Sequence, residues 1–262
     1  MTHGHNSSLL KVICQEGDSY VIKQSDDKNA RLDLEGEMLE FLLNSGLKVP
    51  KIYHKQADFL VMQALESGGP KDHRFEHEAA QALALLHRNL GSHYGFEKTT
   101  LIGALDQPNP LEQDWITFFR DHRLCAYARR AMKAGQIDSS LMHDIEALAG
   151  KLDQYIINPS PPCLIHGDAW AGNILASPHG GLSGFIDAAI YYADPEIELA
   201  FIDLMGGMSR EFFKAYDELN EISPEFWEAR RYLYQLYPLL VHTILFGRGY
   251  AAQVKRIIRF LL

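Results

Sequence analysis

Residues 164–173 read Leu-Ile-His-Gly-Asp-Ala-Trp-Ala-Gly-Asn. Asp168 and Asn173 stand five positions apart. A short apolar run at 163–165 precedes them, and a second one, 173–176, begins at Asn173. Apolar runs of this length predict buried strands, so we expect the polar residues between them to form a loop. A carboxylate and an amide oxygen in one loop could orient a reacting hydroxyl and help to hold a cation. These two side chains are therefore the first candidate site residues.

A second carboxylate follows in the next predicted hairpin. Residues 182–186 form an apolar run that ends at Asp187, after a turn at 177–181. A hairpin of this length returns the chain close to Asn173. An Asp followed five positions later by an Asn is the spacing of kinase catalytic loops, which need a base at the attacking hydroxyl and oxygen ligands for Mg²⁺. The pattern predicts Asp168 as the base, with Asn173 and Asp187 as metal ligands, although each Asp taken alone could be an ordinary turn or strand-end residue.

Lys23 is a third candidate, at the end of the strand predicted at 19–23. In kinases a strand Lys reaches the α- and β-phosphates of the nucleotide, and we predict that role for Lys23. The alternative is a solvated Lys at the edge of a sheet.

A helix predicted at 30–44 supplies the expected partner of Lys23. Its apolar residues at helical spacing are Leu34, Met38, Phe41 and Leu42. On the helix wheel Glu37 lies within this stripe, whereas Glu35 and Glu40 are expected to point elsewhere. A carboxylate on a buried face needs a partner, so the sequence predicts a Lys23–Glu37 ion pair that positions phosphates. The alternative is that Glu37 stays hydrated at the rim of the core.

Residues 60–65 lie where a kinase hinge would offer backbone groups to adenine. Gln63 and Leu65 are assigned as cofactor-binding residues by position alone. A plain buried strand is an equally simple interpretation.

The pattern of the whole chain predicts an α+β fold with two lobes. The predicted elements are strands at 9–14, 19–23 and 59–62, a helix at 30–44, a break at 66–70, and nearly continuous helix from there to the prolines at 159–162. We therefore expect a β-rich, nucleotide-binding lobe at residues 1–66. Residues 67–262 are expected to form a larger, mainly helical lobe for catalysis and substrate binding.

Composition excludes several classes of protein. The chain has 262 residues, of which 47% are hydrophobic, and a net charge of −9, which argues against nucleic acid as the main partner. Three widely spaced cysteines suggest neither a disulfide framework nor a zinc site. No apolar run is long enough to predict a membrane span and the N-terminus does not read as a signal peptide. We expect a cytoplasmic protein.

Several segments resemble the fructosamine kinase family, within the aminoglycoside phosphotransferase group of protein-kinase-like enzymes. Residues 166–173 are similar to the His-Gly-Asp-Leu-Trp-Ser-Gly-Asn motif of that family. Residues 187–196 resemble its Asp-Pro-Ala segment followed by Tyr-Tyr-Gly-Asp-Arg-Glu. Further similar segments lie at 83–88, 114–119 and 234–250, so the resemblance spans most of the chain.

The resemblance implies a bilobal fold, ATP with Mg²⁺, and phosphorylation of a sugar hydroxyl on a ketoamine, the product of glycation of an amine. By matching position it implies the same roles for Asp168, Asn173, Asp187, Lys23 and Glu37 as the residue pattern does. Four residues in segments expected to border the acceptor cleft are assigned to the substrate, with core packing as the alternative for the aromatic ones. They are Trp170, Tyr192, Glu196 and His242.

The sequence departs from the family pattern before Lys23. Residues 4–8, Gly-His-Asn-Ser-Ser, are a short substitute for a glycine-rich phosphate loop. Either the natural start lies upstream or the protein has a reduced phosphate cover. The leading hypothesis is a ketoamine kinase. The alternatives are a kinase acting on an aminoglycoside, choline or another small molecule, and a nucleotide-binding protein without turnover.

Overall fold

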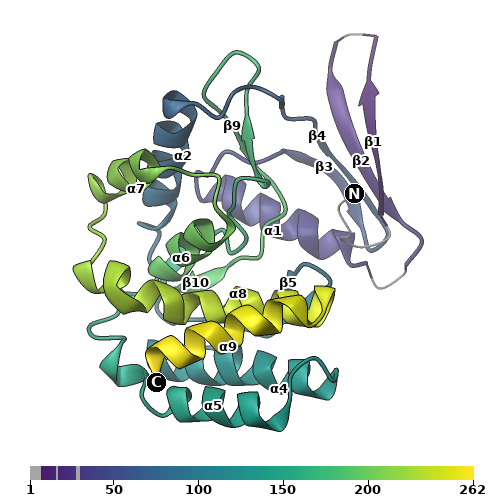
Figure 1. Cartoon of the computed structure of the whole chain (residues 1–262). Coiled ribbons are helices and arrows are strands. Elements are labelled where there is room, and N and C mark those ends of the chain that lie inside the picture. The colour runs from purple at the N-terminus through teal and green to yellow at the C-terminus, as the bar shows by residue number, and fades with distance from the viewer. Residues whose placement is uncertain (1–6, 16, 28–29) are drawn as a thin grey trace.

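The computed structural model describes residues 7–15, 17–27 and 30–262. It has two lobes (Figure 1), a smaller one built on an antiparallel sheet and a larger one made mainly of helices. This arrangement confirms the bilobal α+β architecture expected from the sequence. Of the short substitute for a phosphate loop, residues 4–6 lie outside the described residues, and Ser7 and Ser8 begin the first strand.

The smaller lobe is a four-stranded sheet with strand order β1-β2-β4-β3. Its elements are β1 (Ser7–Ile13), β2 (Ser19–Ser25), helix α1 (Leu32–Asn44), β3 (Ile52–Gln56) and β4 (Phe59–Gln63). The predictions for β1, β2, α1 and β4 are confirmed. Strand β3 was not predicted, because its sequence Ile-Tyr-His-Lys-Gln is mostly polar and only partly buried.

Helix α1 packs against β3 and β4. Leu32, Leu39 and Leu42 are buried, and their spacing places them on one face of the helix. The helix ends before Gly46, whose φ of 91° favours glycine. Burial of this leucine face fixes α1 beside the sheet, in which β2, the strand of Lys23, pairs with β4.

The larger lobe contains most of the helices and three short two-stranded sheets, β5–β6, β7–β10 and β8–β9. Its strands are β5 (Thr100–Ile102), β6 (Leu105–Gln107), β7 (Cys163–Ile165), β8 (Ile174–Ala176), β9 (Leu182–Phe185) and β10 (Tyr191–Ala193). Its α-helices are α2 (His73–Leu86), α3 (Trp115–Phe118), α4 (Cys125–Lys133), α5 (Ser139–Ala149), α6 (Glu196–Met205), α7 (Arg210–Asp217), α8 (Arg231–Phe246) and α9 (Gly249–Leu261). Short π- and 3₁₀-helical segments, η1 (Phe119–Leu124), η2 (Leu152–Gln154) and η3 (Phe226–Arg230), complete it.

The prediction of nearly continuous helix between residues 70 and 159 is wrong at the β5–β6 hairpin. Buried polar side chains fix this hairpin to the rest of the lobe. Gln107 donates to Thr100 Oγ1 at 2.9 Å and to the carbonyl of Ala189 at 3.0 Å, and it accepts from Tyr237 at 2.5 Å. Ala189 and Tyr237 are distant in sequence, so local periodicity gave no sign of them.

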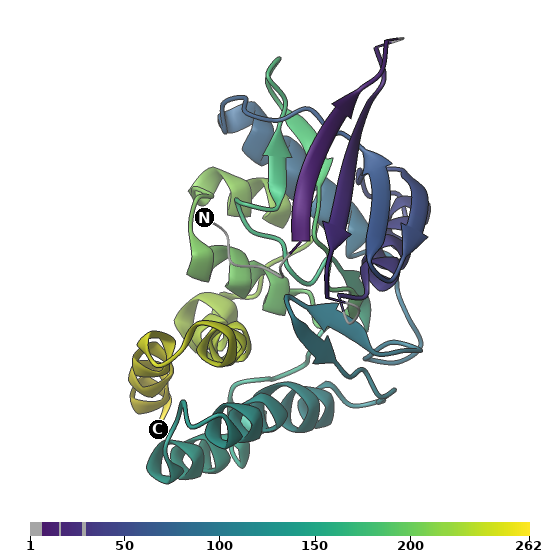
Figure 2. The ribbon, with the colours of Figure 1, turned by 90° about the vertical axis from the view of Figure 1, so that its right-hand side faces the viewer.

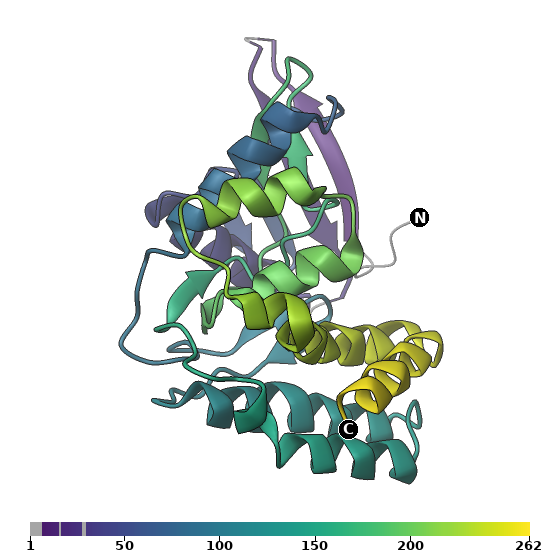
Figure 3. The ribbon, with the colours of Figure 1, turned by 60° about the vertical axis from the view of Figure 1, so that its left-hand side comes forward.

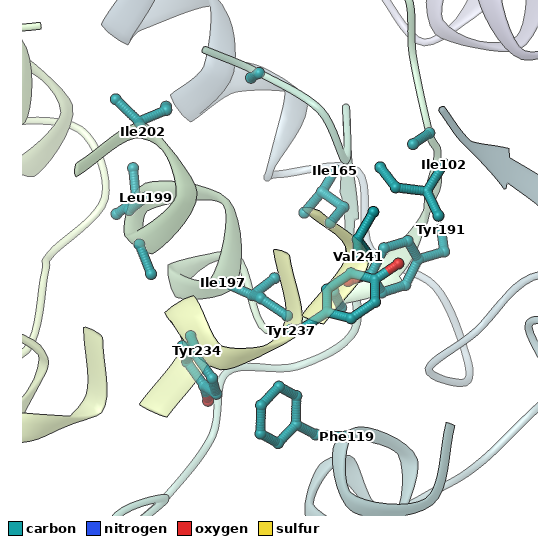
Figure 4. Packing of buried hydrophobic residues seen from close by; sticks show 14 of the residues in the cluster. Ile102, Phe119, Ile165, Tyr191, Ile197, Leu199, Ile202, Tyr234, Tyr237 and Val241 are labelled. Atoms are coloured by element: carbon teal, nitrogen blue, oxygen red, sulfur yellow. The ribbon is translucent and has the colours of Figure 1, made fainter. Parts of the chain in front are cut away.

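Helix α8 is central to the larger lobe. It contacts α4, α6 and α9, and Figures 1 and 3 show it between α6 and the pair α4 and α5. In the core (Figure 4), Tyr237 and Val241 of α8 meet Ile197 of α6 and Tyr191 of β10. Figure 2 shows the β8–β9 hairpin beside the sheet of the smaller lobe, where the Phe185 N–H donates to the carbonyl of Lys48 at 2.8 Å. The two lobes therefore meet next to the loop that carries Asp168 and Asn173.

Among the described residues, no helix combines the length and the apolar character that crossing a membrane would require.

Candidate active site

The loop between β7 and β8 carries the two residues first singled out from the sequence. Asn173 Nδ2 donates to the carbonyl oxygen of Asp168 and to its Oδ2, both at 2.9 Å. The bond pattern leaves the amide oxygen of Asn173 available for another partner. Gly167 has a φ of 85°, and a Cβ there would lie 2.0 Å from the carbonyl oxygen of Ala189, so only glycine fits. The loop is thus held by its own side chains and by close backbone packing.

Glu198 of α6 holds the backbone of this loop by hydrogen bonds. Its Oε2 accepts the N–H of His166 at 3.1 Å and its Oε1 that of Gly167 at 2.6 Å. His87 Nε2 lies 2.9 Å from the same carboxylate, and its Nδ1 lies 2.7 Å from the hydroxyl of Tyr216. Burial alone would raise the pKa of Glu198, but the hydrogen bond and charge of His87 hold it below its usual value. An ionised, buried carboxylate therefore fixes the loop backbone.

Asp187 follows β9 and comes next to the loop. The N–H of Ile186 donates to the carbonyl of Asn173 at 3.0 Å, so the β8–β9 hairpin brings the two predicted metal ligands together as the sequence suggested. Asp187 has a φ of 55°, in the left-handed region. Its side chain is 46% exposed. The carboxylate is open to a ligand.

Lys23 connects the smaller lobe to this group. Its Nζ lies 2.7 and 2.9 Å from the carboxylate oxygens of Glu35 and 3.4 Å from Asp187 Oδ1. Burial alone would lower the pKa of Lys23, but the charges of Glu35 and Asp187 outweigh it and hold that pKa above its usual value. The ammonium is therefore charged and lies between Glu35 of the smaller lobe and Asp187 of the larger one.

The predicted partner Glu37 is wrong, because the carboxylate bonded to Lys23 is Glu35. Glu37 instead pairs with Lys98 at a more exposed position. Glu35 lies on the buried face of α1 defined by Leu32, Leu39 and Leu42, three positions after the first of these. The apolar stripe of Leu34, Met38, Phe41 and Leu42 omits Leu39. Its centre therefore lies closer to Glu37 than the centre of the buried face does.

Asp168 also lines a small pocket of about 30 Å³ to which β1 to β4 contribute no residue. Gly167 and Glu198 line it together with Asp168. Most of its wall is apolar or aromatic, from β5, β10, α6 and α8, and includes Ile102, Tyr191, Phe201, Tyr237, Val241 and His242. Burial and the nearby charge of Asp187 raise the pKa of Asp168, while Asn173 lowers it in part. A carboxylate with a raised pKa is a stronger base toward a bound hydroxyl.

This chain has clear relatives. The fructosamine kinase family matches it over residues 2–262. A protein named as a probable ketoamine kinase from Synechocystis sp. is 36% identical over 208 residues, which cover 77% of this chain and 66% of that protein. One with the same description from Enterococcus faecium is 32% identical over 224 residues, 82% of this chain and 78% of that protein. The chain belongs to the fructosamine kinase family.

Solved structures agree with this assignment. A crystal structure named as a candidate fructosamine-3-kinase from Thermobifida fusca superposes on the whole chain and on 91% of its own, with a TM-score of 0.90 and 28% identity. An ADP-bound aminoglycoside phosphotransferase superposes on 99% of this chain and 90% of its own, with a TM-score of 0.63 at 18% identity, which shows the shared protein-kinase-like fold. Membership of the family places the chain among ATP-dependent small-molecule kinases.

Of the four residues assigned to the substrate, His242 alone lines the pocket beside Asp168. Glu196 is buried and bonded to Arg230 at 2.6 and 3.0 Å, so it stabilises the fold and its assignment to the substrate is corrected. Tyr192 points to the other side of β10 from Tyr191 and stacks on Phe96. Trp170 is partly exposed in the loop itself, and its role stays a prediction.

Gln63 and Leu65, which are predicted to border the adenine, lie at the end of β4 and just after it. The N–H of Gln63, at the end of β4, donates to the carbonyl of Lys51. Leu65 lies against Gly184 of β9, where a Cβ would come within 2.7 Å of Leu65 Cδ1. Their contact with adenine stays a prediction.

Glu35 and Glu198 are the two residues of this site that sequence reasoning missed. For Glu35 a complete helix wheel would have sufficed, because Leu32, Leu39 and Leu42 mark its face. For Glu198 no local signal existed, since its partners lie more than 30 positions away in sequence.

Proposed function

We propose that this protein transfers the γ-phosphoryl group of ATP to a sugar hydroxyl of a ketoamine, with Asp168 as the base. The observation that carries the proposal is the position of Asp168. Its carboxylate is bonded to Asn173 on one side of the loop and borders the apolar pocket on the other. A hydroxyl presented from that pocket would meet Asp168 next to the group formed by Lys23 and Asp187.

The residues fit a magnesium nucleotide. Asp187 offers an exposed carboxylate and Asn173 an amide oxygen, and Mg²⁺ in kinases needs few protein ligands because phosphate oxygens and water supply the others. When bound, the metal would neutralise charge on the phosphates. Lys23, oriented by Glu35, would hold the α- and β-phosphates, and Gln63 and Leu65 would border the adenine. The nucleotide would thus bind between residues 1–66 and residues 67–262.

The chain's own contribution is mainly positioning. Glu198 fixes the backbone of His166 and Gly167, which fixes Asp168. Asn173 orients the Asp168 carboxylate, so that its other oxygen can accept the proton of the acceptor hydroxyl. His242 and Trp170 would contact the acceptor. Because the reaction consumes ATP, we place it in the cytoplasm.

A small amino alcohol such as choline is a second candidate acceptor. The aromatic wall of the pocket would attract an organic cation. An aminoglycoside fits less well, because it carries several ammonium groups. Asp168 and Glu198 are the carboxylates among the lining residues, and Glu198 is already bonded to the loop.

The test is an assay for phosphate transfer from ATP and Mg²⁺ to ribulosamines, fructosamines, choline and an aminoglycoside. We expect transfer to a ketoamine, and we expect Asp168→Asn to reduce kcat by about 100- to 10,000-fold while thermal unfolding stays similar. Transfer only to choline or the aminoglycoside would replace the acceptor class. A folded Asp168→Asn with full activity would remove the assigned base, and nucleotide binding without any transfer would favour a protein without turnover.

A further inference from the structure

Gln107 of the β5–β6 hairpin is buried and holds a point where two segments of the site meet. This point is Ala189, which lies two positions after Asp187. Its N–H donates to the carbonyl of His166 at 2.8 Å, and a Cβ on Gly167 would lie 2.0 Å from its carbonyl oxygen. The same carbonyl accepts from Gln107 Nε2 at 3.0 Å. Ala189 therefore joins the segment of Asp187 to the loop after β7, and Gln107 fixes this contact.

The hydrogen bonds of Gln107 fix the orientation of its amide. Burial raises the pKa of the Tyr237 hydroxyl well above its usual value, so this hydroxyl keeps its proton and donates to Gln107 Oε1 at 2.5 Å. The Nε2 group then faces two acceptors, the carbonyl of Ala189 and Thr100 Oγ1, at 3.0 and 2.9 Å. The oxygen and both N–H donors of the amide are thus occupied, and one donor is directed at Ala189.

A second chain of hydrogen bonds ends on the next carbonyl. Arg123 Nη2 donates to Asn109 Oδ1 at 2.5 Å, which leaves Asn109 Nδ2 to donate to Thr100 Oγ1 at 2.8 Å. Thr100 also accepts from Gln107, so its own proton goes to the carbonyl of Ile190 at 3.2 Å. All four side chains are at most 4% exposed. The two chains therefore have a fixed direction and end at adjacent carbonyls just before β10.

Movement of Ala189 would disturb both parts of the proposed reaction. Asp187 precedes it by two positions, and the carbonyl of His166, which it holds, leads to Asp168 two positions later. A misplacement of about 1 Å between reacting groups can cost about 100-fold in rate. The bond from Gln107 is thus placed where a small shift reaches both carboxylates.

We infer that Gln107 is a positioning residue for phosphoryl transfer. Through the carbonyl of Ala189 it keeps the segment of Asp187 in place relative to the loop after β7. This inference rests on the proposed function. Gln107 acts through Ala189 rather than on the substrate, whereas Thr100, which holds the neighbouring carbonyl, serves mainly to stabilise the hairpin.

The first experiment compares Gln107→Met with Thr100→Val. Both variants keep the size of the side chain, remove buried hydrogen bonds and should lower the midpoint of thermal unfolding. Assayed well below that midpoint, Gln107→Met should reduce kcat about 10- to 100-fold with KM for ATP within about threefold. Thr100→Val leaves the bond to Ala189 in place and should change kcat by less than about threefold.

Gln107→Glu adds a signature in the pH profile, because it keeps the shape of the side chain and introduces one titrating group. The protonated carboxyl can donate to the carbonyl of Ala189 and accept from Tyr237, whereas the ionised carboxylate has no donor for Ala189. As the pH rises through the pKa of the introduced carboxyl, kcat relative to wild type should therefore fall at least about tenfold.

The groups around this position decide where that fall occurs. Tyr127 of α4, Tyr191 of β10 and Arg123 of η1 lie near the Tyr237 hydroxyl, and Arg123 carries the positive charge. Burial raises the pKa of a carboxyl at this position and the charge of Arg123 lowers it, so kcat is measured from about pH 5 to about pH 9.

The outcomes separate this inference from the proposed function. Equal kcat for Gln107→Met and Thr100→Val, or a rise in KM alone, would overturn the positioning role while leaving phosphoryl transfer in place. Full kcat of Gln107→Glu with a pH profile parallel to wild type would overturn it as well. Absence of phosphate transfer by the wild type to any acceptor would overturn the proposed function and this inference with it.

Discussion

Carboxylates occur in two groups near the catalytic loop, and the groups differ in how their oxygens are used. Where the lobes meet, Asp187 is 46% exposed and its contact with Lys23 is long, at 3.4 Å. At α6, Glu196 and Glu198 are both buried and hold short bonds to Arg230 and to the loop backbone. The carboxylate of Asp187 is thus open to a ligand, whereas the oxygens of Glu196 and Glu198 are occupied by bonds that stabilise the fold. Substitutions in the two groups should therefore affect different measurements.

The largest expected effect is on stability, at Arg230. Arg230→Met would leave the buried carboxylate of Glu196 without its partner, which typically costs about 3–5 kcal/mol. Urea unfolding measures the loss, and kcat of the folded protein at low temperature should stay within about threefold, since neither residue touches the loop. The double variant Arg230→Met/Glu196→Gln should recover part of the stability. If the double variant were as unstable as the single one, an unpaired charge would not be the cause.

Glu198→Gln should reduce both the free energy of unfolding and kcat. A glutamine has one acceptor oxygen, so its NH₂ group would face at least one of the donors of His166, Gly167 and His87, at a cost of about 1–3 kcal/mol. We expect kcat to fall roughly 10- to 100-fold, because the backbone of Asp168 loses its support. Glu196→Gln, two positions earlier in α6, is the matched control, and it should reduce stability with little change in kcat. Equal kcat for the two variants would argue against a positioning role for Glu198.

In the group formed by Lys23, Glu35 and Asp187, the change Glu35→Gln should weaken the binding of the nucleotide. The neutral side chain holds Lys23 less firmly, and a hydrogen bond between charged groups contributes about 1.5–3 kcal/mol. We expect kcat/KM for ATP to fall at least about tenfold. Glu37→Gln, one half-turn further along α1, removes an exposed ion pair with Lys98 and should change kcat/KM by less than about twofold. A larger fall in kcat/KM for Glu37→Gln than for Glu35→Gln would restore Glu37 as the functional partner of Lys23.

The smallest expected effect is a change in pH dependence at Asp194. Burial, with the nearby charge of Glu196, raises the pKa of Asp194 to about 6 from 3.8. In the folded state this carboxyl therefore keeps its proton over a range where the unfolded chain releases it. Its contribution to stability is present below about pH 4 and is lost as the pH rises through about 6.

Asp194→Asn, which does not titrate, should remove this loss. Between about pH 4 and pH 7, the change in the free energy of unfolding should differ between wild type and variant by roughly 1–3 kcal/mol. Urea unfolding at the two pH values measures it. Parallel pH profiles would show that Asp194 has an ordinary pKa.

The sequence predicted the parts of the site that depend on neighbours along the chain. The loop of Asp168 between two strands, the hairpin that leads to Asp187, and the strand that carries Lys23 all follow from local patterns, although that strand extends to Ser25, two residues beyond its predicted end. The structure brings Lys23, Asp187 and Asn173 together. The bilobal fold was also predicted, because the apolar residues have the spacing of strands in much of the first lobe and the spacing of helices in most of the second.

Features that depend on distant partners were not predicted. The β5–β6 hairpin is fixed by Tyr237 and Ala189. Glu196 is buried because it pairs with Arg230, which lies 34 positions later in the sequence. A glutamate in isolation looks like a surface residue or a ligand. Glu35 is a different case, because its face could be read from the leucines, and the error came from an incomplete apolar stripe.

The left-handed backbone of Asp187, with its φ of 55°, has a consequence for mutagenesis. Asp and Asn adopt this conformation more readily than alanine or β-branched residues, for which it costs about 1–2 kcal/mol. An alanine scan would therefore add a backbone penalty to the loss of the carboxylate and overstate the role of this side chain in phosphoryl transfer. Asp187→Asn keeps the turn and removes only the charge, so it is the substitution whose kinetics can be interpreted as chemistry.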